Sequence, residues 1–367
     1  MGPGPSNVHP RVLAAMALPT IGHLDPAFVE LMDDIKSLLR DTFLTENEVT
    51  FAVSGPGSVG METALVNMVE PGKKVIVCVN GMFGARIREM VERYSGAPVV
   101  VEAPWGEPID PHKLDTVLTN NKDAKIVAFV HAETSTGVRS DVKELARIAH
   151  KHGCLTIVDA VTSLGGIPVK VDEWELDVVY SASQKCLSCP PGLSPITFND
   201  RALEAMRGRK KKVKSWFMDV GLLLSYWSGA KRTYHHTAPV NALYGLHEAL
   251  RLLHEEGLNN VWARHERISQ LFLAGLGKSG LRTFVSGDVS LPELLTVVVP
   301  DGIDEVAVRD HLLQKHNIEI GAGLGKLAGK IWRIGIMGYT SNEKNVKLCL
   351  AGLDDALLNA RLQSPNE

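Results

Sequence analysis

Residues 155–192 read LTIVDAVTSLGGIPVKVDEWELDVVYSASQKCLSCPPG, and this stretch carries the pattern that decides the fold. Its segments 155–161 and 177–183 are short, nearly continuous apolar runs, which is typical of strands covered on both faces of a parallel sheet. Similar runs lie at 49–54, 74–79, 98–103 and 126–133, and helical patterns lie at 7–45, 61–69, 84–95 and 142–153. This alternation predicts the α/β class, with a mainly parallel wound sheet in a large domain.

A second, smaller domain is expected after residue 257. The helical pattern at 241–257 and its continuation to 276 predict a long connecting helix. Strand patterns at 294–300 and 332–338 then alternate with helical patterns at 306–316 and 343–360, which indicates a small C-terminal α+β domain. The expected units are an N-terminal arm (1–20), the large domain (21–257) and the small C-terminal domain (258–367).

The composition is typical of a globular protein, with 45% hydrophobic residues and a net charge of −3. This near-neutral balance implies neither a nucleic-acid nor a membrane partner. No apolar run approaches the roughly 20 residues of a membrane span. The basic run at 207–214 lacks interleaved aromatic residues, so it predicts a solvated helix face. Five cysteines and no recognisable secretory signal predict a cytoplasmic protein with reduced thiols, although the peroxisome and the mitochondrion stay open as alternatives.

A glycine-rich turn, Gly55-Pro-Gly-Ser-Val-Gly60, follows the first predicted strand and opens a helix. Its G-x-G-x-x-G spacing matches the dinucleotide fingerprint, but the second strand ends at Asn80 and offers no acidic residue for a ribose hydroxyl. A more general interpretation is an anion site, because backbone N–H groups and the positive end of a helix favour phosphate. A plain tight turn is the structural alternative.

The pair Cys186-x-x-Cys189 allows three interpretations. A zinc site usually requires a second Cys or His pair at ligand spacing, and the sequence has none. A redox motif would place the first cysteine at a helix start, whereas Pro190 and Pro191 follow here at once. We therefore expect both cysteines to be small buried residues that contribute packing.

Lys185 and Asp159 are the strongest candidates for chemistry. Lys185 comes just after the strand at 177–183, at the sheet edge where wound α/β folds bind ligands. Asp159 interrupts the apolar strand at 155–161, and a carboxylate there requires a compensating partner. A surface lysine and a loop-capping aspartate are the structural alternatives. Pyridoxal phosphate (PLP) would use both residues and the glycine-rich turn, because it carries an aldehyde for Lys185, a ring nitrogen for Asp159 and a phosphate for Gly57.

Essentially the whole chain resembles the class V aminotransferases among the fold-type I PLP enzymes, and within them the alanine–glyoxylate / serine–pyruvate aminotransferase family. The motifs that carry the resemblance are GPGPSN (2–7), SGPGS (54–58), NGMFG (80–84), HAETSTGV (131–138), VDAVTSLGG (158–166), SASQKCLSCPPG (181–192), YHHTAPV (234–240) and WRIGIMG (332–338). The resemblance implies the fold-type I architecture, with a large PLP-binding domain and a smaller C-terminal domain.

The resemblance also implies a role for each matching residue. Lys185 would bind the cofactor aldehyde and Asp159 the pyridine nitrogen, and these two would be the catalytic residues. The other cofactor-binding residues so implied are Gly57, Ser58 and Gln184 at the phosphate, Phe83 on the ring, Thr134 near the ring oxygen, and Tyr234 and Thr237 at the phosphate of the neighbouring subunit. The active site would then be completed only in a homodimer. Relatives often have Trp where this chain has Phe83, and Ser where it has Thr134.

Arg333 and Gly4 are the implied substrate-binding residues. Arg333 would clamp the substrate α-carboxylate, for which a bidentate guanidinium is well suited. It also stands in an apolar strand pattern, where a buried arginine needs an anionic partner, and an internal ion pair is the alternative. Gly4 would line the substrate pocket. No metal is expected.

The function so implied is a PLP-dependent aminotransferase that moves the amino group of alanine or serine to glyoxylate or pyruvate. The mechanism would be ping-pong through pyridoxamine phosphate, with small amino acids and 2-oxo acids as ligands. A cysteine desulfurase-like enzyme of the same fold is one alternative, and it would need a mobile nucleophilic cysteine. A non-catalytic binding protein on the PLP fold is the other.

Overall fold

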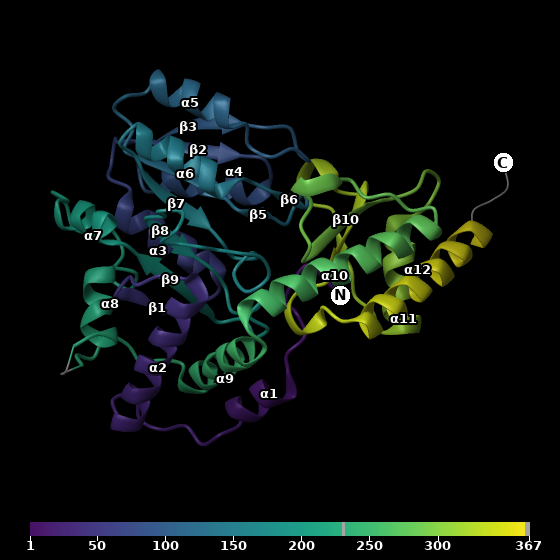
Figure 1. Ribbon diagram of the computed structural model, residues 1–367, viewed down its shortest axis with the longest axis horizontal. Coiled ribbons are helices and arrows are strands. Elements are labelled where there is room, and N and C mark those ends of the chain that lie inside the picture. The colour runs from purple at the N-terminus through teal and green to yellow at the C-terminus, as the bar shows by residue number, and fades with distance from the viewer. Residues whose placement is uncertain (230–231, 364–367) are drawn as a thin grey trace.

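The computed structural model describes residues 1–229 and 232–363 (Figure 1). A seven-stranded sheet forms its centre, in the order β1-β9-β8-β7-β4-β2-β3. The strands are β1 (Val49–Ser54), β2 (Lys74–Val79), β3 (Ala97–Glu102), β4 (Ile126–Val130), β7 (Leu155–Asp159), β8 (Val178–Tyr180) and β9 (Leu193–Phe198). All pairs from β8 to β3 are parallel, which confirms the predicted mainly parallel sheet.

β9 was not predicted, and it is antiparallel to both of its neighbours, β1 and β8. Because it reverses direction between them, β1 runs the same way as β8. The carboxyl ends of β1, β2, β4, β7 and β8 therefore meet at one edge of the sheet. The strand predicted over 126–133 is shorter than expected, since the chain leaves the sheet after Val130 and forms a hairpin of β5 (Ala132–Glu133) and β6 (Val138–Arg139).

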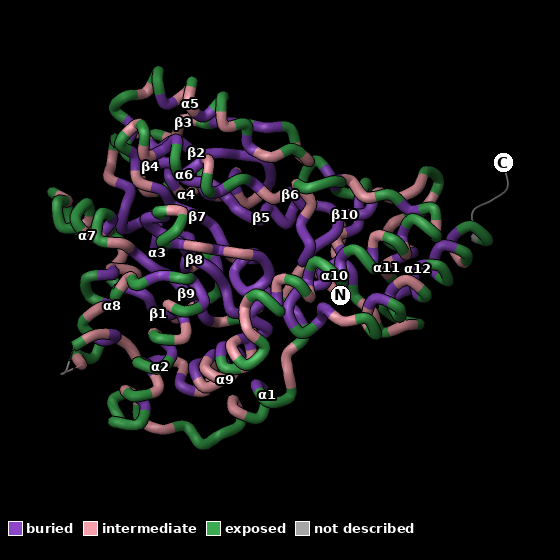
Figure 2. The backbone as a smooth tube through the Cα atoms, in the orientation of Figure 1, coloured by how far each residue is buried: buried purple, intermediate pink, exposed green. Residues whose placement is uncertain are grey.

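Helices cover the sheet on both faces, so that the buried backbone lies mostly in its strands (Figure 2). They are α3 (Gly57–Met68), α4 (Met82–Arg93), α5 (Pro111–Thr119), α6 (Val142–Lys151), α7 (Asp200–Arg207) and α8 (Val220–Trp227). α3 and α4 begin a few residues before the predicted helices, immediately after the turns that follow β1 and β2. Their N-terminal ends therefore lie at the carboxyl edge of the sheet, where an anion would be favoured.

The prediction of one helical segment over 7–45 was wrong for its middle part, which is not helical. The structure has α1 (Pro10–Met16) and α2 (Pro26–Phe43), separated by residues 17–25. A new helix start explains the break, because the Asp25 side chain accepts a hydrogen bond from the Ala27 N–H at 2.9 Å and Pro26 occupies the first turn. Both helices pack against α9 (Val240–Glu256).

The predicted connecting helix is also two helices, α9 and α10 (Leu258–Lys278), joined at Gly257. Gly257 has a φ of +84°, a left-handed conformation that glycine adopts without strain and that ends a helix. The buried apolar residues form two main clusters, one reaching from Val12 to Val261 and the other from Ile268 to Ala360. This division falls within α10, close to the predicted domain boundary.

The C-terminal unit contains a three-stranded antiparallel sheet in the order β10-β12-β11. Its strands are β10 (Leu294–Val298), β11 (Gly321–Ala322) and β12 (Ile331–Gly335), and its helices are α11 (Glu305–His316) and α12 (Glu343–Gln363). Three short 3-10 helices complete the described elements: Gly287–Val289, Gly325–Leu327 and Gly338–Thr340. The first residues lie beside this unit (Figure 1), where the Gly335 N–H donates to the Met1 carbonyl at 2.8 Å. Among the described helices, none combines the length and the apolar character needed to cross a bilayer.

Candidate active site

A cavity of about 160 Å³ lies at the carboxyl edge of the large sheet. It is bordered by the ends of β4 and β7, by the first turns of α3 and α4, and by the loop after β8. Its lining residues are Pro56, Gly57, Ser58, Met61, Phe83, Arg86, Val130, Ala132, Thr134, Asp159, Val161, Thr162, Gln184 and Lys185. The fold therefore brings together all the residues predicted to contact the cofactor within one chain.

Asp159 ends β7 and is only 3% exposed. Its Oδ1 accepts a hydrogen bond from the Val161 N–H and its Oδ2 accepts one from the Tyr180 hydroxyl, both at 2.9 Å. Burial raises the pKa of Asp159 to about 6, and the two hydrogen bonds oppose that rise. Among the described residues, no lysine or arginine forms an ion pair with Asp159, and Lys185 affects its pKa only through the electric field of its charge.

Lys185 faces the same cavity from the loop after β8. Burial, reinforced by the nearby Arg333 guanidinium, lowers the pKa of Lys185 to about 8. Its Nζ donates a hydrogen bond to the carbonyl of Pro3. Gly4 lies directly beside this side chain, because a Cβ on Gly4 would come within 2.8 Å of the lysine Cδ. The segment around Gly4 is held in place where the Ser6 hydroxyl donates to the Lys185 carbonyl at 2.7 Å.

The glycine-rich turn at the start of α3 packs its backbone closely against neighbouring side chains. A Cβ on Gly57 would come within 2.9 Å of the Ala182 Cβ, so only glycine fits there without displacing a neighbour. In the described part of the chain, no side chain caps the N-terminus of α3. Its first N–H groups are therefore oriented as an anion site requires, with Ser58 on the cavity lining.

Phe83 and Thr134 are placed by a residue that the sequence analysis missed, Glu133. The buried Glu133 carboxylate accepts hydrogen bonds from the backbone N–H groups of Phe83 at 3.0 Å and Gly84 at 3.2 Å, and from both the N–H and the hydroxyl of Ser135. It thereby caps the first turn of α4 and fixes the hairpin that contains Thr134. Burial raises the pKa of Glu133, and the hydrogen bonds to Ser135, Gly84 and Phe83 oppose that rise.

Two further residues at the site were not predicted. Tyr180 ends a buried apolar strand, where a phenol needs a hydrogen-bond partner, and this signal could have linked it to Asp159. Glu133 could have been found by the same reasoning, as a carboxylate in an apolar run. Arg86 lies one turn after Phe83 on α4, with its guanidinium 5.0 Å from the centre of the phenyl ring, and the sequence gives no signal for it.

Arg333 lies on β12, outside the lining of the cavity but near Lys185. Its Nε donates to the Ala322 carbonyl at 2.7 Å. Within residues 1–229 and 232–363, no carboxylate forms an ion pair with Arg333, so the internal salt bridge considered as an alternative is not present. Partial burial lowers the pKa of Arg333, which is the cost expected of a guanidinium without an anionic partner.

Tyr234 and Thr237 do not line the cavity of their own chain. Both are exposed, and the Tyr234 ring lies 5.3 Å from that of His23. Their predicted contact with a neighbouring subunit stays a prediction.

Cys186 and Cys189 are both buried and unbridged. Burial raises the pKa of Cys186 well above its usual value and the pKa of Cys189 to about 12, so neither thiol forms a reactive thiolate near neutral pH. Cys186 Sγ donates to the Thr162 carbonyl at 3.1 Å. These features agree with packing and with neither the redox nor the zinc interpretation.

The cavity fits PLP. Gln184 contributes a buried amide oxygen that has no partner among the described residues, a further polar group available to a ligand. The uncapped start of α3 suits the phosphate, Lys185 the aldehyde and Asp159 a protonated ring nitrogen. The residues present therefore match the phosphate, the aldehyde and the ring nitrogen of this cofactor with groups of suitable charge.

Comparison with known proteins agrees with this site. The family "Aminotransferase class-V" matches residues 8–346. The alanine–glyoxylate aminotransferase of Rattus norvegicus is 40% identical, over 97% of this chain and 87% of its own. The solved alanine–glyoxylate aminotransferase of a Nostoc species is 47% identical, covers 97% of this chain and 94% of its own, and superposes with a TM-score of 0.95. The solved ureidoglycine–glyoxylate aminotransferase of Bacillus subtilis is 40% identical, and the match covers 98% of this chain and 93% of its own. Its TM-score is 0.96.

Proposed function

Because this chain belongs to the class V aminotransferase family, we propose that it transfers the amino group of a small amino acid, alanine or serine, to glyoxylate. The protein is a PLP-dependent aminotransferase of the alanine–glyoxylate type. The observation that carries the proposal is the placement of Lys185 and Asp159 on one cavity whose wall includes the uncapped start of α3.

PLP, when bound, holds the donor nitrogen covalently and withdraws electrons from the donor Cα. Asp159 supports this chemistry by keeping a proton on the ring nitrogen. Its pKa of about 6 leaves it largely ionised at neutral pH, and a cation beside it favours the ionised form further. The hydrogen bond from Tyr180 holds the carboxylate in one orientation.

Lys185 is proposed as the acid and base at the donor Cα. A pKa near 8 leaves part of the amine neutral at physiological pH, so that it can take a proton and return it. Arg333 contributes to this lowered pKa and is also the proposed partner of the substrate α-carboxylate. One residue therefore both positions the substrate and adjusts the base.

Gly57, Ser58 and Gln184 are proposed to hold the phosphate, Phe83 the ring face, and Thr134 the ring oxygen region. Tyr234 and Thr237 are proposed to reach the phosphate of a neighbouring subunit in a homodimer, and their exposure in the single chain supports this. The five buried, free cysteines support a reducing compartment, and we propose the cytoplasm.

A second donor is favoured by the Bacillus relative, which is named as an (S)-ureidoglycine–glyoxylate transaminase and is 39% identical over 98% of this chain. The test is a matrix of initial rates on the PLP-loaded enzyme, with alanine, serine and (S)-ureidoglycine as donors and glyoxylate and pyruvate as acceptors. The proposal expects the highest kcat/KM for alanine or serine with glyoxylate. A clear preference for (S)-ureidoglycine would replace the proposed donor and leave the acceptor in place.

The two rival functions predict different outcomes. A cysteine desulfurase needs a thiol at the substrate, but no cysteine lines the cavity around Lys185, and all five are buried. Release of sulfide from cysteine at a rate above transamination would support that rival. A non-catalytic protein would bind PLP without turnover of any pair in the matrix.

A further inference from the structure

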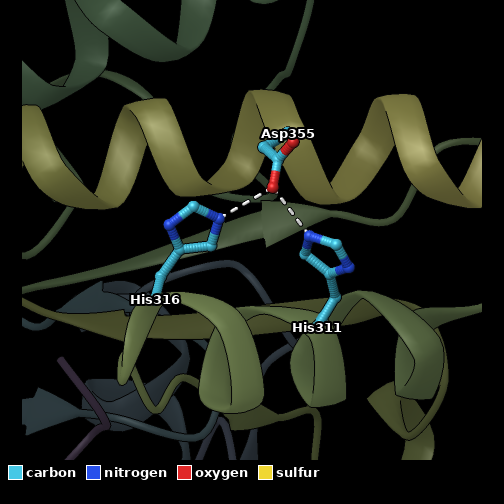
Figure 3. A group of neighbouring side chains, drawn as sticks. All are labelled: His311, His316 and Asp355. Carbon is cyan, nitrogen blue, oxygen red and sulfur yellow. Dashed lines mark hydrogen bonds and ion pairs between the residues drawn. The ribbon is translucent and has the colours of Figure 1, made fainter.

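Two helices of the C-terminal unit bring three potential metal ligands together on the surface (Figure 3). His311 and His316 lie on α11, and Asp355 lies on α12. The Nε2 atoms of both imidazoles point at the same carboxylate oxygen, Asp355 Oδ2, at 2.7 Å and 2.8 Å. The ligand atoms of the three residues all lie within 4.8 Å of one another.

This convergence does not belong to the active site. None of the three residues lines the cavity around Lys185, and all three come from elements C-terminal to the large sheet. The histidines are partly sheltered, with side chains 15% and 30% exposed, while the Asp355 side chain is 53% exposed. An ion could therefore enter from solvent, and water could complete its coordination.

We propose that His311, His316 and Asp355 form a binding site for one divalent transition-metal ion, with Zn²⁺ as the best match. Two imidazole nitrogens and one carboxylate oxygen are a ligand set that Zn²⁺ accepts, with water in the remaining position. The hard cations Mg²⁺ and Ca²⁺ prefer oxygen ligands and would bind poorly.

The two contacts to Asp355 need only a small adjustment, and the two imidazole ligand nitrogens, which lie within 4.8 Å of one another, would approach the same spacing. Ligand atoms about 2.1 Å from a zinc ion at tetrahedral angles lie about 3.4 Å apart, so each N···O contact would open by roughly 0.6 Å. Binding also requires both Nε2 atoms to be free of protons. A neutral ring would move its proton to Nδ1, and a protonated ring would release one to solvent.

The ion would link α11 to α12 by bonds stronger than the present hydrogen bonds. These helices already pack closely, since a Cβ on Gly352 of α12 would come within 3.3 Å of the His316 ring. Metal binding should therefore stabilise the C-terminal unit and leave the chemistry at Lys185 unchanged.

The test is a titration of the tag-free PLP-loaded enzyme, first freed of metals with a chelator, with ZnCl₂ by calorimetry and by equilibrium dialysis. The expected result is one Zn²⁺ per chain and a rise in Tm, with little change in transaminase rate. Variants His311→Gln, His316→Gln and Asp355→Asn should each lose affinity. Loss of a residue that only hydrogen-bonds a metal ligand already lowers metal affinity about 10–100-fold. Loss of a direct ligand should therefore lower Zn²⁺ affinity at least as much.

His112→Gln is the matched control, because His112 is an exposed histidine on α5, in the large-sheet part of the fold. It should leave Zn²⁺ affinity unchanged. The proposal is overturned if the wild type binds no Zn²⁺, or if His311→Gln and Asp355→Asn bind it as tightly as His112→Gln does. A failure here would leave the proposed function intact, because the transaminase assay reads a separate set of residues.

Discussion

Tyr180 and Asp159 are register partners on the adjacent parallel strands β8 and β7, and the Tyr180 hydroxyl donates to the Asp159 carboxylate at 2.9 Å. The sheet itself thus fixes the orientation of the carboxylate. Lys185 faces the same cavity from the loop that follows β8. The strand register therefore fixes the carboxylate proposed to act on the ring nitrogen, and the loop after β8 brings the proposed acid and base to the same cavity.

Asp159→Asn should stabilise the cofactor-free protein at neutral pH while removing activity. Folding raises the pKa of Asp159 from 3.8 to about 6, so ionisation opposes folding above about pH 6 and has no effect below about pH 4. The gain in unfolding free energy should reach up to about 3 kcal/mol at neutral pH and vanish at about pH 4. Urea unfolding of the cofactor-free protein at the two pH values measures it.

Asp115→Asn is the control for that experiment. Hydrogen bonds from His152 and Lys151 lower the pKa of this partly exposed carboxyl, so its ionised form favours folding. The substitution should stabilise the protein at neither pH. An equal gain in both variants would show that the effect at Asp159 is not electrostatic burial.

Glu133→Gln should weaken cofactor binding through the start of α4. A neutral amide has only one acceptor oxygen. Its NH₂ group would face backbone N–H groups that now donate to the carboxylate, so some of these hydrogen bonds would be lost. Hydrogen bonds to a charged group contribute about 1.5–3 kcal/mol, so the Kd for PLP should rise roughly 10–100-fold. The near-UV circular dichroism of bound PLP should change as Phe83 shifts. Glu89→Gln, an exposed carboxylate on the same helix, should leave both measurements unchanged.

Gly57→Ala should reduce PLP affinity and stability together. The added methyl group would meet Ala182 at 2.9 Å and Val161 at 3.2 Å, and overpacking of this kind costs about 1–3 kcal/mol. Gly277→Ala is the matched control, because a Cβ there has nothing within 4 Å and alanine favours the helix by about 1 kcal/mol. The Tm should therefore fall in the first variant and hold or rise in the second. Equal affinity for PLP in Gly57→Ala and wild type would contradict the proposed phosphate site.

Arg333→Leu should raise the KM for both substrates and also shift the pH dependence of the reaction. Removing one partner of a buried charge pair costs about 2–5 kcal/mol, which corresponds to roughly 30-fold or more in kcat/KM. The Arg333 charge helps to lower the pKa of Lys185, so the variant should have a higher pKa at Lys185. The rising limb of its pH–rate profile, where Lys185 loses its proton and becomes a base, should therefore move to higher pH. Arg333→Lys should keep the pH profile and lose the bidentate contact. An unchanged KM in Arg333→Leu would assign the carboxylate to another residue.

Most of the fold could be predicted because strands such as β1, β2, β4 and β7 are buried on both faces and so appear as nearly unbroken apolar runs. β9 was missed because Ser194, Pro195 and Thr197 interrupt its apolar pattern, and only its pairing with β1 and β8 reveals it. The structure places the predicted cofactor contacts of one chain around one cavity, while their roles stay predictions. Glu133 and Tyr180 act by orienting others. The sequence marks both as polar groups in apolar runs that need partners, but which groups they bond depends on the tertiary placement of their strands.

The cysteine pair offers the last prediction, because the sequence left its role open. In the double variant Cys186→Ala, Cys189→Ala, the enzyme should keep its bound PLP absorbance and most of its transaminase rate. Both thiols are buried and protonated, so the loss should be one of packing, roughly 1–2 kcal/mol in total. Cys78→Ala, a buried cysteine on β2 outside the cavity lining, should lose about half as much stability and no activity. If the folded double variant instead failed to bind PLP while Cys78→Ala bound it normally, the thiols would belong to the catalytic machinery beside Lys185.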